Sequence, residues 1–154
     1  MTFDNKVLQG EWEADQPMDN NLKSIDINAA DQKELEKIKG IGPTFAKRTI
    51  KYRNLLGGYT SKDQFNSIYG ITDEALKALS DNVTIDVSAI DKIMINSASK
   101  DQIKAHPYLK DWAVVAEIIS QRDKKNLNNL DFLVEKDLMS QDELNKVLPY
   151  ISFE

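Results

Sequence analysis

The chain has 154 residues, of which 41% are hydrophobic and 29% charged, enough apolar material for one ordinary domain or two small ones. It has no cysteine and a single histidine, so disulfides, cysteine–zinc sites and iron–sulfur clusters are excluded, and we expect neither a metal nor a cofactor. A net charge of −5 argues against a protein that coats nucleic acid along its whole surface, and no apolar run reaches the roughly 18 residues of a membrane helix.

Residues 1–24 lack helical or strand periodicity and carry five acidic and two basic side chains, which predicts a flexible acidic leader. The leader is unlike a signal peptide or a membrane anchor, so the sequence as given is expected to be soluble. The sequence leaves open where the protein resides, and whether this chain is the exported part of a longer, membrane-anchored protein.

The chain repeats itself after the leader, with a shift of 68 or 69 residues. The matching segments are 27–30 with 95–98, 46–53 with 115–122, and 72–76 with 140–144. Tandem self-similarity of this kind indicates two copies of one structural unit. We therefore predict one module at residues 25–86 and a second at residues 87–154.

Both modules are predicted to consist of short helices. Four segments fit the capping box, in which a side-chain oxygen and the carboxyl or amide three residues later satisfy free backbone amides. These pairs are Asp31 with Glu34, Ser61 with Gln64, Ser99 with Gln102, and Ser140 with Glu143. No stretch alternates well enough to predict a sheet, and residues 83–85 and 151–153 are expected to be extended module ends. The predicted fold class is all-α.

The first module contains a glycine-rich turn between two of its helices. Gly40 supplies the left-handed residue that ends the first helix, and Ile41 is placed to fill the space between the two helices. Gly42 allows a ligand to approach the backbone closely, and Ala46 is small where the helices cross. This spacing resembles the helix-hairpin-helix motif along its whole length.

The same region is basic, because no acidic residue occurs from 37 to 62, where seven Lys and Arg residues occur. Free amides at the start of the second helix, with the positive end of its dipole, form an anion site. We predict a phosphate site made by Lys39, Gly40, Ile41, Gly42, Thr44, Lys47, Arg48 and Lys51. Such contacts read the backbone rather than the bases, so binding is expected to be sequence-independent and salt-sensitive. The alternative interpretation is a glycine turn that only joins two helices, with the lysines as a solvated face.

Further short motifs run through the first module. They are Asp26-Ile27-Asn28-Ala29-Ala30, Glu34-Leu35, Gly40-Ile41-Gly42-Pro43, Ile50-Lys51-Tyr52-Arg53, Gly57-Gly58-Tyr59 and Tyr69-Gly70-Ile71. Together they resemble the competence DNA-uptake receptors of the ComEA type, and the likeness continues more weakly through residues 92–154. The resemblance implies two tandem helix-hairpin-helix modules, which are short-helix bundles of the SAM-like and ComEA-like kind. It also implies non-specific binding of double-stranded DNA by a bacterial protein that faces the periplasm or the cell exterior from a membrane anchor.

The other turns depart from this pattern. Gly70-Ile71-Thr72 is followed by two acidic residues, and residues 105–111 replace the turn of the first module without any glycine, so neither is predicted to bind phosphate. His106 is expected to be a packed or surface residue rather than a ligand. Tyr108 and Trp112 are predicted to lie in the core, with a partner-binding patch as the alternative.

Two functions from different classes follow from these patterns. The first is a sequence-independent DNA-binding module with double-stranded DNA as its partner, for which the resemblance implies a role in competence and DNA uptake. The second is a protein-interaction or scaffold module that has kept the helix-hairpin-helix fold without binding DNA and contacts another protein through its second module. Neither an enzymatic activity nor a small-molecule substrate is expected, because helix caps explain the acids near residue 31 and no nucleophile–base pair or metal spacing occurs. The sequence does not reveal the oligomeric state.

Overall fold

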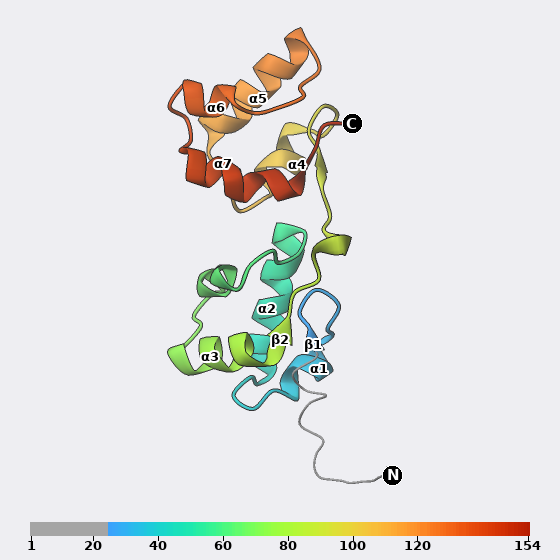
Figure 1. Cartoon of the computed structure of the whole chain (residues 1–154), viewed down its shortest axis with the longest axis vertical. Helices are drawn as coiled ribbons and strands as arrows, with labels where there is room; N and C mark the ends of the chain where they lie inside the picture. Colours follow the sequence, from blue (N-terminus) through green and yellow to red (C-terminus); the bar gives the residue numbers. More distant parts are fainter. Residues whose placement is uncertain (1–24) are drawn as a thin grey trace, which may run out of the picture. The chain divides into compact units, whose positions relative to one another are not determined.

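The computed structural model describes residues 25–154, so the predicted leader at residues 1–24 lies outside the described residues. The described chain is mainly helical, and its class is all-α, as the sequence predicts (Figure 1). It divides into two compact units. Among the described residues, unit 1 holds 25–53 and 59–87, and unit 2 holds 54–58 and 88–154.

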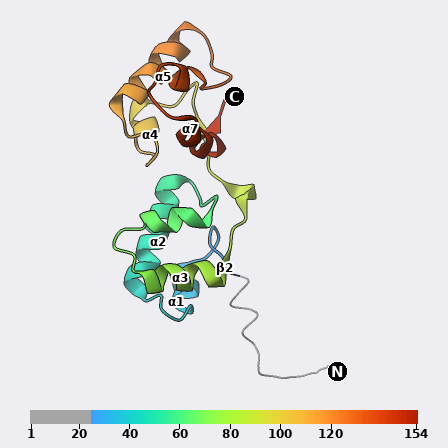
Figure 2. The ribbon, with the colours of Figure 1, turned by 60° about the vertical axis from the view of Figure 1, so that its left-hand side comes forward.

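Unit 1 consists of short helices closed by one pair of two-residue strands. Its elements are β1 (Ile25–Asp26), α1 (Gln32–Glu36), α2 (Pro43–Leu56), the 3-10 helix η2 (Lys62–Ser67), α3 (Asp73–Asn82) and β2 (Val83–Thr84), and the 3-10 helix η3 (Val87–Ala89) follows. The last three residues of α2, 54–56, belong to unit 2. The strands are parallel, with Ile25 opposite Val83, and they hold the two ends of the unit side by side. In Figure 1 and Figure 2, α3 lies across the N-terminal half of α2.

Unit 2 is built in the same order. Its elements are β3 (Ile93–Met94), α4 (Lys100–Lys104), α5 (Trp112–Lys124), α6 (Phe132–Glu135), α7 (Gln141–Val147), the 3-10 helix η4 (Leu148–Tyr150) and β4 (Ile151–Ser152). β3 and β4 are parallel, with Ile93 opposite Ile151. The segments expected to be extended module ends are therefore extended, and each forms a short strand at the end of its unit.

The predicted capping boxes are present at all four positions. At Asp31 the box is complete, because the carboxylate accepts from the Glu34 amide at 2.8 Å and the Glu34 side chain accepts from the Asp31 amide at 3.0 Å. Complete boxes also open α4 at Ser99 and α7 at Ser140. The box at Ser61 opens the 3-10 helix η2 instead of an α-helix. Local side-chain chemistry therefore sets where these short helices begin.

One arginine in each unit holds that unit's N-terminal turn. Arg53 Nη1 donates to the carbonyl oxygens of Ile27 at 3.1 Å and Ala30 at 2.7 Å. Arg122 Nη1 makes the matching pair of bonds in unit 2. Because α2 and α5 carry these arginines near their C-terminal ends, each pair of bonds ties a long helix to the start of its unit.

An asparagine makes a second set of matching bonds. The Asn28 amide oxygen accepts from the Tyr59 backbone N–H at 2.7 Å, and its nitrogen donates to the Tyr59 carbonyl at 3.0 Å. Asn96 makes the same two bonds to Leu127, at 2.7 Å and 3.0 Å. Each asparagine side chain thus bonds to both the N–H and the carbonyl of a residue 31 positions later, as a neighbouring strand would.

Two of the tyrosines in the resemblance motifs lie against each other. Tyr59 is fully buried, its hydroxyl donates to the Thr49 carbonyl at 2.7 Å, and its ring meets the Phe65 ring edge-on at 4.9 Å. Tyr52 is half-buried, with its ring centre 6.2 Å from that of Tyr59. Tyr59 is therefore a core residue of unit 1.

His106 is packed, with only 4% of its surface exposed, which is one of the two placements that the sequence analysis allows. Its Nε2 lies 2.8 Å from the carbonyl oxygen of Leu56, a residue of the same compact unit, and its Nδ1 accepts from the Tyr108 amide at 3.1 Å. A neutral ring with its proton on Nε2 satisfies both contacts. Burial lowers the pKa of His106, against a smaller upward effect of the bond to Leu56.

Replacing Arg53 by Met is expected to lower the free energy of unfolding by about 1–3 kcal/mol, because two carbonyls of the N-terminal turn lose their donor. Urea unfolding followed by circular dichroism measures the change. Lys51→Met is the matched control, because Lys51 is an exposed cation on the same helix and its loss should cost less than about 0.5 kcal/mol. Equal losses in the two variants would contradict a structural role for Arg53.

The pKa of His106 in the folded protein is expected to lie below the ordinary value of about 6.5. Since the unfolded chain then binds the proton more readily, the free energy of unfolding should fall as the pH is lowered through about 6.5. Proton NMR titration of the single histidine gives the pKa directly, and His106→Gln should remove this part of the pH dependence. A pKa at or above the ordinary value would contradict a buried neutral ring.

Candidate nucleic-acid interface

The turn between α1 and α2 depends on Gly40. Its φ of +100° lies in the left-handed region, and the turn is closed by a bond from the Ile41 amide to the Ile38 carbonyl at 3.0 Å. A Cβ at position 40 would also lie 3.2 Å from the Ala78 Cβ of α3. Gly40 is therefore required both by the backbone conformation and by the close approach of α3.

The start of α2 leaves several backbone amides open. Gly42 occupies the N-cap position, because its carbonyl accepts from the Ala46 amide at 2.9 Å, and Pro43 follows as the first helical residue. Within residues 25–154 the structure shows no acceptor for the amides of Gly42, Thr44 and Phe45. A Cβ at Gly42 would meet nothing within 4 Å, so the surroundings of this residue are open. This geometry suits an anion held by backbone N–H groups at the positive end of a helix.

Exposed side chains of the predicted site surround this backbone. Thr44, Lys47 and Lys51 are exposed and lie at positions i, i+3 and i+7 of α2, which places them on one helical face. Lys39 is exposed in the turn itself. Ile41 is different, because it is buried at 3% and its amide is already bonded within the turn. Ile41 is therefore a core residue behind the turn rather than a donor to a ligand. The Phe45 amide, which the sequence analysis did not name, is open like those of Gly42 and Thr44.

Arg48 reaches the second turn of unit 1. Its Nη1 donates to the Tyr69 carbonyl at 3.2 Å, and its guanidinium carbon lies 4.9 Å from the centre of the Tyr69 ring and 5.8 Å from that of Phe45. A Cβ at Gly70 would come within 2.8 Å of Nη1, so the side chain passes close over this turn. Arg48, which the sequence predicts to bind phosphate, is thus bonded to the turn at residues 68–72 of its own unit.

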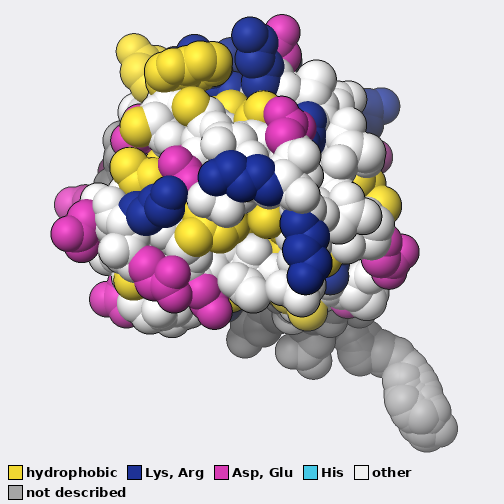
Figure 3. Space-filling view, turned by 90° about the horizontal axis from the view of Figure 1, so that it is seen from above, with side chains coloured by type: hydrophobic (Ala, Val, Ile, Leu, Met, Phe, Trp, Pro, Cys, Tyr) yellow, Lys and Arg dark blue, Asp and Glu magenta, His cyan; other side chains and the backbone are white. Residues whose placement is uncertain are grey.

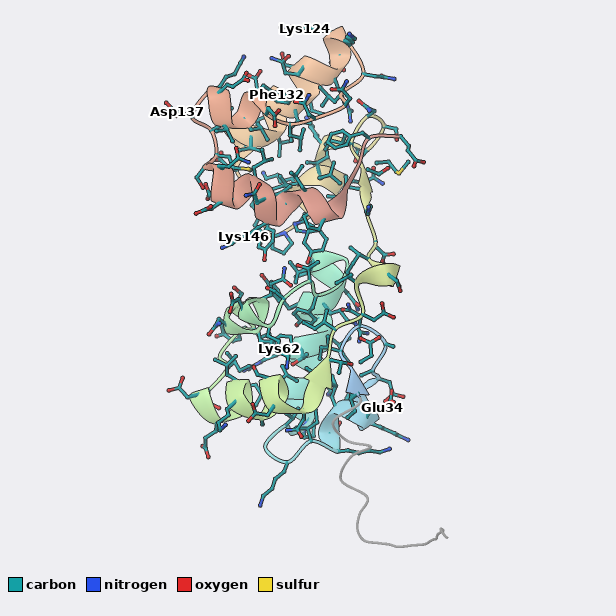
Figure 4. All side chains as sticks on the ribbon, in the orientation of Figure 1. Glu34, Lys62, Lys124, Phe132, Asp137 and Lys146 are labelled. Carbon is teal, nitrogen blue, oxygen red and sulfur yellow. The ribbon has the colours of Figure 1, made fainter. Side chains whose placement is uncertain are left out.

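Three of the seven basic side chains in residues 37–62 are hydrogen-bonded within unit 1. Arg48, Arg53 and Lys62 each donate to a backbone carbonyl of unit 1. Figure 4 shows Lys62 lying toward α3, where it bonds to the carbonyl of Ser80. The other four, Lys37, Lys39, Lys47 and Lys51, are exposed. The exposed positive charge of this stretch therefore lies in and just before the turn, at Lys37 and Lys39, and on α2 at Lys47 and Lys51.

The comparison with known protein families matches this region. Residues 20–84 match the family model described as a helix-hairpin-helix motif. This part of the chain carries a helix-hairpin-helix motif. The motif is commonly involved in DNA binding, so the match supports a general nucleic-acid-binding role. No curated protein and no solved structure matches the chain.

Five other α-helices, α1, α3, α4, α5 and α7, are capped by a side-chain oxygen that accepts from one of their first amides. Thr72 caps α3 by accepting from the Ala75 amide at 3.1 Å, and two acidic residues follow it. In α5 the Asp111 carboxylate accepts from the Ala113 amide at 2.9 Å. Asp111 occupies the position in unit 2 that matches Gly42 in unit 1, at the shift of 69 residues. The Asp111 carboxylate thus places a negative charge at the start of α5, whereas the first turn of α2 carries no acidic residue.

α5 also lacks the cations of α2. The residues that match Thr44, Lys47, Arg48 and Lys51 are Ala113, Ala116, Glu117 and Ser120. Glu117 pairs with Lys136 at 2.8 Å, and this hydrogen bond lowers the pKa of the Glu117 carboxyl. The face of the molecule seen in Figure 3 mixes Lys and Arg with Asp and Glu side chains.

The prediction that Trp112 lies in the core is wrong. Its side chain is 54% exposed, whereas Tyr108 is half-buried against the core of unit 2. Trp112 is the first residue of α5, and its ring lies beside α4, with Lys100 Nζ 5.5 Å and Lys104 Nζ 5.7 Å from its centre. A residue at this position has no preceding helical turn to pack against, so its ring lies at the surface under two ammonium groups.

Two further properties concern the chemistry of the surface. Among residues 25–154, no three side chains of the metal-ligating types Asp, Glu and His converge on a point that could hold an ion. None of the helices in that range is both long and apolar enough to cross a membrane.

Gly40→Ala and Gly42→Ala are expected to have opposite effects on folding. Gly40→Ala should lower the free energy of unfolding by about 1–2 kcal/mol, because alanine is strained in the left-handed region and its Cβ meets Ala78. Gly42→Ala should change it by less than about 1 kcal/mol, because its Cβ meets nothing and only the cap preference of glycine is lost. Urea unfolding of the two variants side by side measures both values. A larger loss for Gly42→Ala would contradict the geometry of the turn.

Proposed function

We propose that the protein binds DNA without sequence preference, through phosphate groups held at the start of α2. The observation that carries this proposal is the set of open amides at Gly42, Thr44 and Phe45, at the positive end of a 14-residue helix. Phosphate oxygens supply both the acceptors and the negative charge that such a helix end favours. The exposed Lys39 and Lys47 add charge beside it.

Double-stranded DNA is the ligand that we propose for this site. Backbone amides and lysines contact phosphates and carry no information on base sequence. With few cations, binding should be weak, with a dissociation constant on the order of 10⁻⁴ to 10⁻⁶ M and a log–log salt slope of about −0.9 for each phosphate neutralised. We propose a binding role and no catalytic one for this chain.

The two units are, in this proposal, tandem copies of one module, of which only the first has kept its ligand. The matching arginine and asparagine bonds, made twice at shifts of 68 and 69 residues, support the common plan. Asp111 and Glu117 support the loss of the ligand from the second copy. The resemblance to competence DNA-uptake receptors extends the proposal to DNA uptake, with the protein facing the periplasm or the cell exterior.

Contact with another protein through unit 2 is the second candidate function. The observation that favours it is Trp112, which is 54% exposed, since large aromatic side chains at the surface often anchor protein partners. Such a complex would form independently of DNA and would depend on Trp112 rather than on Lys47.

The double variant Lys47→Gln/Lys51→Gln is expected to weaken binding to a random duplex and to lower the magnitude of the log–log salt slope by about 1 to 2, because two phosphate contacts are lost. Fluorescence anisotropy of a labelled duplex, titrated at several salt concentrations, measures both quantities. The matched control is Lys124→Gln/Lys146→Gln, which removes the same charge from unit 2, where Figure 4 shows both lysines.

The control pair should leave the salt slope unchanged. Equal weakening by the two pairs would mean that net charge, and not the hairpin, determines binding. Absence of binding by the unaltered protein at low salt would contradict the proposal and favour the protein-partner function.

A further inference from the structure

Tyr69 is the most exposed of the large hydrophobic side chains in residues 25–154, with 78% of its surface accessible. It lies in the second turn of unit 1, between η2 and α3. The turn itself does not need this ring, because the neighbouring Ile68, which is 2% exposed, supplies its buried apolar contact. An aromatic ring that is displayed to solvent in a tight turn is a candidate surface for stacking.

The Arg48 side chain contacts both the ring and the backbone of Tyr69. The Arg48 guanidinium carbon lies 4.9 Å from its centre, and Nη1 of the same side chain donates to the Tyr69 carbonyl at 3.2 Å. Phe45, in the first turn of α2, lies near the same guanidinium, at 5.8 Å. The side chains of Phe45 and Tyr69 therefore both lie near the Arg48 guanidinium, and the three residues are called the aromatic–arginine cluster below.

One member of the aromatic–arginine cluster, Phe45, lies at the proposed phosphate site. Phe45 belongs to the first turn of α2, where its own amide is one of the open donors, and Arg48 lies four residues after Thr44 on the same helix. Arg48 thus lies one turn along α2 from these amides, and its guanidinium contacts the Tyr69 ring. Arg48 has five N–H donors, and the structure shows one of them bonded.

The charges beside Tyr69 indicate which part of a nucleotide it would meet. Asp73 and Glu74 open α3 immediately after this turn, and both carboxylates repel a phosphate. A nucleobase is uncharged, so these acids do not oppose it. The first turn and the second turn of the unit thus offer different surfaces, one for an anion and one for a flat ring.

We propose that Tyr69 is a stacking platform for an unpaired nucleobase of a DNA strand whose phosphates are held at the start of α2. This inference rests on the proposed DNA-binding function and adds to it a ligand class, single-stranded or gapped DNA. Proteins that bind single strands combine a positive surface for the backbone with aromatic rings for the bases. In an intact duplex the base faces are covered by their neighbours, so Tyr69 adds affinity only where bases are unpaired.

The test compares three labelled ligands by fluorescence anisotropy: an oligo-deoxythymidine strand, the same strand with abasic sites in place of every base, and a random duplex. Tyr69→Ala should weaken binding to the oligo-deoxythymidine strand by roughly 5- to 100-fold, and Tyr69→Phe, which keeps the ring, by less than about twofold. The salt slope should stay the same in Tyr69→Ala, because stacking releases no counterions.

On the abasic strand and on the duplex, Tyr69→Ala should bind within about twofold of the unaltered protein, because these ligands offer no free base face. Equal weakening on all three ligands, or no weakening on oligo-deoxythymidine, would overturn the inference. If Tyr69→Ala fails to fold, the affinities of the unaltered protein for the two strands are compared instead. The inference requires weaker binding to the abasic strand than to oligo-deoxythymidine, and equal affinities would overturn it.

The double variant Lys47→Gln/Lys51→Gln separates this inference from the proposed function. If that variant weakens binding to every ligand while Tyr69→Ala weakens none, the phosphate site stands and the stacking platform is contradicted. If the lysine pair changes nothing on any ligand, the proposed function itself is contradicted and the inference fails with it.

Discussion

The left-handed turn at Gly40 is the constraint on which the site depends. Because the turn is closed by backbone bonds and by the buried Ile41, it needs no polar side chain to end α1 or to begin α2. The next residue, Gly42, can then cap α2 without blocking its amides. The direction in which α2 leaves the turn also places Ala46 in the core, so Thr44, Lys47 and Lys51 face solvent on the other side of the helix.

The first backbone amides of a helix have no partner within the helix, and the helices of this chain differ in how these amides are treated. Asp31, Thr72, Asp111 and Ser140 cap their helices with their own oxygens. Gly42 caps α2 without one. Glycine at this position is only a few tenths of a kcal/mol less favourable than a capping side chain. A small loss of stability therefore leaves the first amides of α2 open, whereas Asp111, at the matching position of α5, accepts from the Ala113 amide.

The sequence predicted the parts of this structure that depend on local chemistry. The capping boxes, the left-handed glycine and the extended module ends follow from residue types at short spacing, and each is present in the structure. A count of charges could not show that Arg53 and Lys62 bond to carbonyls of their own unit, since these partners lie 18 to 26 residues away. For the same reason the contact between Arg48 and Tyr69 was missed.

Two other features show where residue type alone is a poor guide. Trp112 was expected in the core because large aromatic residues are usually buried, but its position at the first residue of α5 leaves it exposed. The turn before α7 lacks glycine, yet Asp137 adopts a φ of +59°, and bonds from residues 137 and 138 back to 134 and 133 close a Schellman motif (Figure 4). An aspartate there provides what glycine provides at position 40.

The central claim is that backbone amides at the start of α2 hold phosphate. The most direct measurement is a two-dimensional ¹⁵N–¹H NMR titration of the full chain with a short DNA duplex. The account predicts that the largest shifts occur at the amides of Gly42, Thr44 and Phe45, while those of residues 112–114 in α5 stay in place. Shifts centred on α5, or spread evenly over both units, would contradict it.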